Sequence, residues 1–330
     1  MATNLQVTTM ESTAAGTVVN NPFVTATIAD WIKFCDVKAA TQRTYDKAVK
    51  SFVGYLASNG IEQPQREDVI AYRKWMVDED NNGANAVFKV STARLYLVVV
   101  KKFFRWLSSK LIYPNVAADV KLPQMGAEGT EEHAHDALTL SESRQVISSF
   151  KATDEKTLRD KCIMSMMLCS GLRSIEIVRL DIGDIEKRRG QWFVRVHGKA
   201  RAGKVDSVQI SEPVKAMIDE YLSVRPKGKK GTPLFISTAN RNRGQRLQTQ
   251  TVSRLAKKTF ADIGIVSERI TCHSCRATSV TLMLEAGVPI REVQRVMRHR
   301  SPATTEIYAA DLNKYNNRGV KFLSNLLFAA

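Results

Sequence analysis

The chain has 330 residues, of which 44% are hydrophobic and 25% charged, with a formal net charge of +16 at pH 7. This length suits two domains, and the composition is that of an ordinary soluble globular protein. The basic excess predicts a polyanionic partner, either nucleic acid or an anionic membrane surface. The excess is concentrated in residues 186–260, which hold 18 Lys and Arg against 5 Asp and Glu.

Cysteine usage and the apolar pattern predict a cytoplasmic protein with no membrane partner. The first 32 residues contain no Lys or Arg, so the start of a signal peptide is missing. No apolar run approaches the roughly 18 residues that span a bilayer. An odd number of cysteines in a long chain indicates reduced thiols. They are Cys35, Cys162, Cys169, Cys272 and Cys275.

The first part of the chain predicts a flexible arm at residues 1–24, followed by a helical domain at residues 25–122. Apolar residues at helical spacing predict helices over 41–56, 66–76 and 91–109. Between the apolar residues of the last helix lie Arg94, Lys101, Lys102 and Arg105, which form either a solvated face or a surface for DNA.

Residues 123–136 combine Pro, Gly and acidic residues without an apolar period, which predicts a linker between domains. A second domain is expected at residues 137–317, with Ser141 as the N-cap of its first helix. Strands are expected at 191–196 and 205–210, joined through a polar hairpin. Further helices are expected at 157–169, 173–180, 212–224, 249–263, 273–286, 290–298 and 303–310.

The tail, residues 318–330, predicts an apolar helix with Phe322, Leu323, Leu326 and Leu327 at helical spacing. Such a helix docks either on its own domain or on a neighbouring protomer, because a single domain rarely leaves an apolar stripe exposed.

Several residues suit chemistry on a phosphodiester. The planar guanidinium of arginine matches phosphate and keeps its charge, and Arg173 and Arg276 both stand at expected helix starts. His273 precedes Arg276 by three residues, and His299 precedes Tyr308 by nine. A tyrosine nucleophile needs nearby cations or a base. Each residue taken singly is also compatible with a surface salt bridge or a packed histidine.

A metal site is a weaker reading of Cys272-His273-Ser274-Cys275. A second pair of ligands would have to come from His133 and His135, whose spacing is unlike that of a zinc finger. A thioredoxin-like role lacks the surrounding βαβ unit. We therefore expect no metal.

Three segments resemble the signature boxes of tyrosine recombinases, the phage integrase family. They are Ser-Gly-Leu-Arg-Ser-Ile-Glu (170–176), His-Ser-Cys-Arg-Ala-Thr (273–278) and His-Arg-Ser-Pro-Ala-Thr-Thr-Glu-Ile-Tyr (299–308). Residues 198–204 resemble the family's β-hairpin lysine segment. The resemblance implies a mainly α fold with a small antiparallel β-sheet. It comprises a helical SAM-like core-binding domain that clamps DNA and an α+β catalytic domain.

The resemblance also implies the catalytic roles. Arg173 and Arg276 would hold the scissile phosphate, supported by Glu176. Lys199, or alternatively Lys204, would protonate the leaving 5′-oxygen, and His273 would assist proton transfer. His299 would donate to a phosphate oxygen, and Tyr308 would form a 3′-phosphotyrosine. No metal or nucleotide cofactor is implied.

The implied function is site-specific DNA recombination through a Holliday junction, by a homotetramer on double-stranded DNA with inverted half-sites. The protein would integrate, excise or resolve a mobile element or replicon, with possible accessory DNA-bending or directionality factors. Alternatives are a type IB topoisomerase-like nicking-closing enzyme, a chromosome-dimer resolvase and a non-catalytic DNA-binding regulator. The expected DNA contacts are Arg43, Lys101, Lys102, Arg105, Arg201, Lys204, Arg241 and Arg243.

Three positions depart from the commonest family pattern. Ala277 replaces a frequent His, Cys275 a frequent Leu, and Arg298 a frequent Gly before His299. None of these removes a catalytic group. Arg298 is expected either to contact phosphate or to point to solvent.

Overall fold

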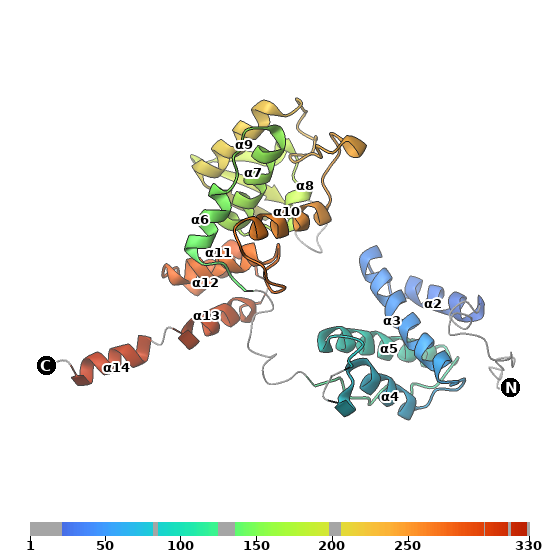
Figure 1. Cartoon of the computed structure of the whole chain (residues 1–330). Helices are drawn as coiled ribbons and strands as arrows, with labels where there is room; N and C mark the ends of the chain where they lie inside the picture. Colours follow the sequence, from blue (N-terminus) through green and yellow to red (C-terminus); the bar gives the residue numbers. More distant parts are fainter. Residues whose placement is uncertain are drawn as a thin grey trace. The chain divides into compact units, whose positions relative to one another are not determined.

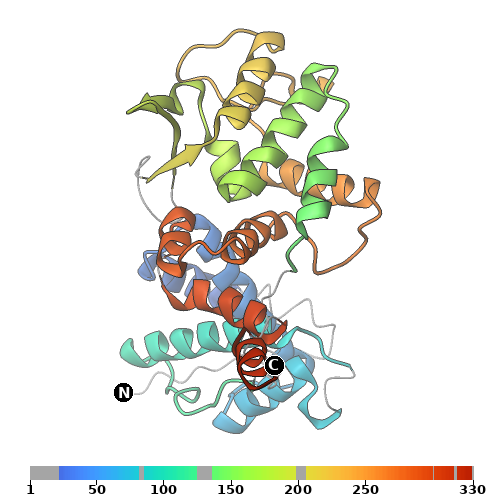
Figure 2. The ribbon, with the colours of Figure 1, turned by 90° about the vertical axis from the view of Figure 1, so that its left-hand side faces the viewer.

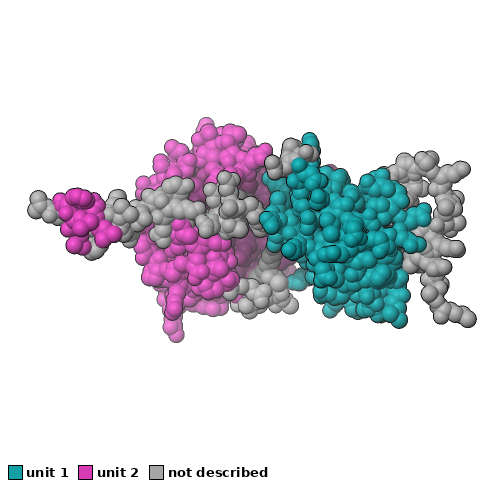
Figure 3. Space-filling model, turned by 90° about the horizontal axis from the view of Figure 1, so that it is seen from below, with its two compact units in different colours: residues 1–130 teal, residues 131–330 magenta. Residues whose placement is uncertain are grey.

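The structure is a computed structural model that describes residues 22–81, 85–124, 136–197, 206–299, 301–315 and 318–328. The chain divides into two compact units, residues 1–130 and 131–330, which Figure 3 shows in different colours. Within these ranges, no helix is both long enough and apolar enough to cross a membrane.

Unit 1 is helical, as the apolar periodicity predicts. Its core is rich in aromatic rings, including the fully buried Trp31, Phe52 and Tyr72. The helix α2 begins at Pro22, three residues before the expected start of the helical region. Its helices are α2 (Pro22–Phe34), α3 (Ala39–Ser58), α4 (Arg66–Val77) and α5 (Val90–Ser109), with a short 3₁₀ turn at Glu79–Asn81.

Unit 2 combines helices with one small sheet (Figures 1 and 2). The α-helices before the sheet are α6 (Leu140–Ser148), α7 (Glu155–Ser170) and α8 (Ser174–Arg179). Those after it are α9 (Glu212–Val224), α10 (Thr249–Asp262), α11 (Ser274–Glu285), α12 (Ile290–Met297), α13 (Ala303–Tyr315) and α14 (Arg318–Phe328). Short 3₁₀ turns lie at Ile182–Asp184 and Asn240–Asn242.

The start of α6 differs from the expectation. Thr139, and not Ser141, is the N-cap. The Thr139 hydroxyl accepts the backbone N–H of Glu142, while the Glu142 carboxylate accepts the backbone N–H of Thr139 at 2.7 Å. This reciprocal capping box satisfies two helix-end donors at once, which Ser141 cannot do without a partner three residues later.

The sheet contains a strand that the sequence pattern missed. Its order is β1 (Ile185–Arg188), β2 (Gln191–Val196), β3 (Asp206–Ile210), all antiparallel. The expected strands correspond to β2 and β3. The turn between β1 and β2 uses Arg189 and Gly190, both with positive φ, so the two-residue turn lacks the usual Asn-Gly or Asp-Gly signal.

The helix α7 lies at the centre of unit 2, with α8, α9, α10 and α11 around it (Figure 1). Its side chains from Cys162 to Leu168 are buried without interruption. A second, smaller cluster joins α11, α12 and α13 through Ala277, Val280, Val293, Met297 and Tyr308. In contrast, the apolar side chains that the structure describes in α14, at positions 323–328, are exposed, with Phe328 at 83% and Leu327 at 72%. The single chain therefore leaves this apolar surface uncovered.

Candidate active site

The first signature box begins where α7 ends. Gly171 closes that helix with φ +58, a left-handed conformation in which glycine carries no steric penalty. A Cβ at this position would lie 2.4 Å from the sulfur of Met297, so the backbone approaches α12 closely. Two residues later, Arg173 stands immediately before α8.

Glu176 joins two arginines. It is fully buried, and its Oε1 accepts a hydrogen bond from Arg173 Nη1 at 2.9 Å. Its Oε2 accepts the backbone N–H of Arg173 at 2.9 Å and Arg298 Nη2 at 2.7 Å. Arg298 therefore does not point to solvent, in contrast to one of the two expectations, and a contact with phosphate stays a prediction. Only its departure from glycine marked the residue in the sequence.

Arg276 holds the site together from α11. The residue is 7% exposed, and its guanidinium donates to the carbonyl oxygens of Gly171 and Met297. Burial, followed by the charges of Arg173 and Arg298, lowers the pKa of Arg276 to about 9. The guanidinium groups of Arg173, Arg276 and Arg298 lie near a single carboxylate, that of Glu176. The cluster therefore carries surplus positive charge that an anion would neutralise.

His299 and Tyr308 lie beside this cluster. The Nδ1 of His299 is 2.8 Å from the hydroxyl of Thr305, which is fully buried in α13 and fixes the ring. The rings of His299 and Tyr308 are nearly parallel, with centroids 6.5 Å apart. Tyr308 is 6% exposed and packs in the cluster that includes Met297. The structure thus brings Arg173, Arg276, His299 and Tyr308 into one connected group.

The remaining catalytic candidates occupy different positions. His273 is exposed at the N-cap of α11, one turn before Arg276. Lys199, Lys204 and Arg201 lie outside the described residues, between β2 and β3.

The Cys272–Cys275 pair is buried, and both thiols are free. Burial raises the pKa of Cys272 to about 11 and also raises that of Cys275, which disfavours the thiolate that binds metal. The described part of the chain holds no group of three or more His, Cys, Asp or Glu that could bind a metal. His133 and His135 lie outside it.

The candidate DNA contacts in unit 1 fall into two kinds. Arg43 and Arg105 are exposed, and the exposed Lys102 donates to the hydroxyl of Tyr45 at 2.9 Å. Lys101, however, donates to the carbonyl of Val120 at 2.8 Å, and Arg94 donates to that of Pro123. Part of the basic stripe on α5 therefore anchors the end of this unit.

In unit 2, Arg241 and Arg243 are exposed around the 3₁₀ turn after β3 and α9. The exposed Arg243 lies 3.4 Å from the half-buried Glu155 at the start of α7, a surface ion pair that contributes little to stability.

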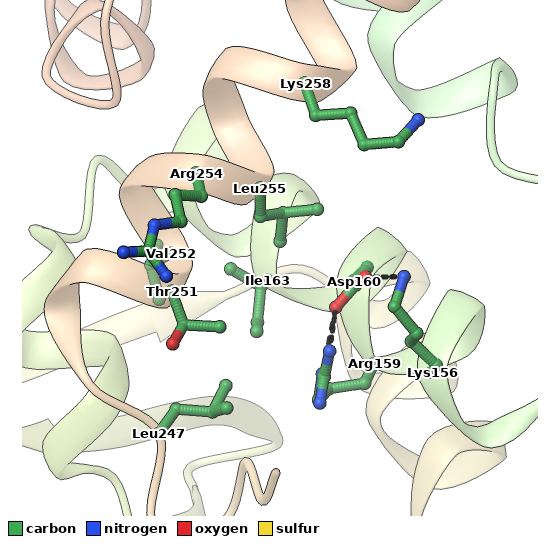
Figure 4. Close-up of a pocket in the computed structure, with 10 residues that line it drawn as sticks. All are labelled: Lys156, Arg159, Asp160, Ile163, Leu247, Thr251, Val252, Arg254, Leu255 and Lys258. Carbon is green, nitrogen blue, oxygen red and sulfur yellow. Dashed lines mark hydrogen bonds and ion pairs between the residues drawn. The ribbon is translucent and has the colours of Figure 1, made fainter. Parts of the chain in front are cut away.

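A cavity of about 200 Å³ lies between α7 and α10 (Figure 4). Its walls include Ile163, Val252 and Leu255. The guanidinium of Arg159 donates hydrogen bonds to Oδ1 of Asp160 at 2.6 Å and to the carbonyl oxygen of Ile236 at 2.8 Å. The buried charge is thus already paired, and the cavity has none of the signature residues.

Comparison with known proteins defines the class. The sequence model described as "Phage integrase family" matches residues 137–314, and that of the "Phage integrase, N-terminal SAM-like domain" matches residues 33–110. The chain therefore belongs to the phage integrase family, the tyrosine recombinases that cleave and rejoin DNA. This confirms the family and the fold class expected from the sequence.

The relatives are recombinases. The chain is 26% identical over 279 residues to tyrosine recombinase XerC of Thermodesulfovibrio yellowstonii, covering 81% of this chain and 84% of that protein. Its fold resembles that of XerH site-specific recombinase bound to palindromic difH substrate, with TM-score 0.67, 15% identity, and coverage of 87% and 80%. A lambda integrase tetramer bound to a Holliday junction matches with TM-score 0.60, 17% identity, and coverage of 84% and 78%.

Proposed function

We propose that this protein is a site-specific DNA recombinase that exchanges strands through a 3′-phosphotyrosine intermediate and a Holliday junction. The observation that carries the proposal is the connected group of Arg173, Arg276, His299 and Tyr308 in unit 2. Arg173 and Tyr308 are more than 130 positions apart in the sequence. Arg276 nevertheless donates hydrogen bonds to the carbonyl of Gly171, close to Arg173, and to that of Met297, close to His299.

The chemistry follows from these groups. The Tyr308 phenol oxygen attacks phosphorus, and the bond from phosphorus to the 5′-oxygen breaks. Arg173 and Arg276 neutralise the two non-bridging oxygens as charge develops, because a planar guanidinium donates two hydrogen bonds to phosphate. His299 donates to one of those oxygens.

The leaving 5′-oxygen takes a proton from Lys199, with Lys204 as the alternative, and His273 assists proton transfer by accepting the proton that the Tyr308 phenol loses as it attacks. Rejoining is the reverse reaction with a 5′-hydroxyl from the other duplex. No metal or nucleotide is needed, since the phosphotyrosine bond conserves the free energy of the broken bond.

Strand exchange between two duplexes requires four active sites, and we propose a homotetramer on inverted half-sites. The exposed apolar face of α14 supports this assembly, because burying it in a neighbouring protomer would join subunits in a ring. Lambda integrase, a protein of similar fold, forms a tetramer bound to a Holliday junction, which is consistent with the proposed tetramer. Residues 318–330 would then be the exchanged segment.

Residues 25–122 would clamp DNA together with the catalytic domain, residues 137–317, across the linker at 123–136. Arg43, Lys102, Arg105, Arg241 and Arg243 are exposed and can reach phosphates. The substrate would be a site of a mobile element or replicon in the cytoplasm, with the nucleoid as the working location. The proposal covers both a resolvase and an integrase role.

A nicking-closing enzyme of the type IB topoisomerase kind is the second candidate. One chain holds Arg173, Arg276, His299 and Tyr308 together, so cleavage by a single protomer is chemically possible. Paired sites distinguish the two functions. A recombinase yields exchanged products only when two sites are present, whereas a nicking-closing enzyme relaxes supercoiled DNA without them.

The test uses a nicked duplex that traps the covalent intermediate, carrying a site identified by footprinting this protein. The wild type should become linked to DNA, and Tyr308→Phe should bind the duplex without forming the adduct. Tyr55→Phe is the control, since Tyr55 lies in the aromatic group of unit 1 and the change keeps its ring. An adduct that persists in Tyr308→Phe would exclude this tyrosine as the nucleophile.

A further inference from the structure

Arg298 occupies a backbone position that suits glycine. It ends α12 with φ +55 and ψ 42, in the left-handed region where a side chain is disfavoured. At the ends of α7 and α11 the chain places glycines, Gly171 and Gly287, in the same region. At Arg298 the side chain makes an interaction that can offset this backbone cost.

That interaction is the ion pair with Glu176. Only 12% of the Arg298 side chain and 1% of the Glu176 side chain are exposed. The same carboxylate receives Arg173 Nη1 at 2.9 Å. Glu176 therefore has guanidinium groups on both of its oxygens, and each restricts how the other can lie.

The neighbours of Arg298 contact other parts of the site. The carbonyl of Met297 accepts a hydrogen bond from Arg276, and Nδ1 of His299 pairs with Thr305 at 2.8 Å. Three consecutive residues thus connect α8, α11 and α13. A shift of Arg298 would move the backbone that carries His299.

We propose that Arg298 is a positioning residue for strand cleavage. Its ion pair fixes Glu176, aims the guanidinium of Arg173 at the phosphate and ties the segment carrying His299 to the start of α8. This inference rests on the proposed function.

The role is indirect. Nη2 of Arg298 is engaged with Glu176, and Nε is buried, with no hydrogen-bond partner in the described part of the chain. The Arg298 side chain is also half as exposed as that of Arg173, which is 25% exposed. Arg173 is therefore the better placed of the two to reach a phosphate.

Arg298→Gly tests the proposal, because glycine relieves the backbone and removes only the side chain. A backbone effect alone would leave activity unchanged. Arg189→Gly is the matched control: Arg189 also has a positive φ (+48) but is exposed in the turn between β1 and β2. Arg298→Lys restores a charge without the planar fork.

The readouts are thermal stability, affinity for a half-site duplex and the single-turnover rate of covalent complex formation on a nicked duplex. We expect Arg298→Gly to slow that rate by about 10- to 100-fold, as misplacement of reacting groups does, with affinity changed by less than about 3-fold. Arg298→Lys should recover part of the rate, and Arg189→Gly should match the wild type.

A double-mutant cycle with Glu176→Gln shows whether Arg298 acts through Glu176. The double variant Glu176→Gln with Arg298→Gly should be no slower than Glu176→Gln alone. Two results would overturn the proposal. The first is a double variant whose loss of rate equals the product of the losses of the two single variants, and the second is an Arg298→Gly rate within about 2-fold of wild type.

If Arg298→Gly fails to fold, Arg298→Lys and Arg298→Gln replace it. Equal rates for these two would refute the role of the charge, and a faster Lys variant would support it. The absence of any adduct from the wild type would instead contradict the proposed function itself.

Discussion

Gly171→Ala should destabilise the catalytic unit through two separate effects. The first is the backbone: at φ +58 an alanine costs about 1–2 kcal/mol relative to glycine. The second is packing. The new Cβ would lie 2.4 Å from the sulfur and 2.5 Å from the methyl carbon of Met297, which is fully buried. Forcing an extra methyl into a filled interior costs about 1–3 kcal/mol.

Together these effects amount to about 2–5 kcal/mol, or about 4–20 °C in Tm for a unit of this size. Gly264→Ala provides the control, because Gly264 has φ +85 near the end of α10 and nothing within 4 Å of its added Cβ. It should show the backbone effect alone, about 1–2 kcal/mol.

Calorimetry of the full chain measures both variants, and the transition that moves in both belongs to unit 2. Gly171→Ala should also slow covalent complex formation, because the Gly171 carbonyl accepts a hydrogen bond from Arg276. Equal destabilisation by the two substitutions would refute the packing argument, since it would mean that Met297 moves aside without cost.

Three further predictions concern DNA. Arg173→Lys keeps the charge but loses the planar fork, so covalent complex formation should fall about 100-fold in a single-turnover assay while half-site binding in gel shifts changes little; an unchanged rate would make Arg173 structural. Deleting residues 318–330 should weaken tetramer formation and strand exchange but not single-site binding, and unaltered recombination would show that α14 is dispensable. The logarithm of the affinity for DNA should fall linearly with the logarithm of the salt concentration, with a slope of about −0.9 per phosphate contact. Lys102→Ala or Arg105→Ala should each make this slope shallower by about 0.9. Leu111→Ala, at an exposed uncharged side chain, should leave the slope unchanged.

Local patterns in the sequence account for most of the elements. Helices such as α9 (Glu212–Val224) match the predicted bounds, because apolar spacing and end signals act over three or four residues. The signature boxes likewise depend on short, contiguous motifs. They were therefore sufficient to indicate the family that the comparisons confirmed.

Where local signals were ambiguous, the tertiary structure decided. The strand β1 is short and partly charged, and it forms because β2 supplies its hydrogen-bond partners. The N-cap of α6 moved to Thr139 because Glu142 completes the capping box. The sequence placed Lys101 in a uniform basic stripe, but its ammonium group donates a hydrogen bond to the carbonyl of Val120, near the end of unit 1.

The sequence by itself determined which residue types are available for phosphate chemistry and where the helices that carry them begin. It did not determine their pairing. Arg298 and Glu176 are 122 positions apart, and Arg276 and Gly171 are 105 apart. Which side chains meet over such separations depends on how α8, α11 and α12 pack, and burial then makes each ion pair and hydrogen bond between them obligatory. Only the tertiary structure therefore reveals that a single carboxylate, Glu176, holds both Arg173 and Arg298.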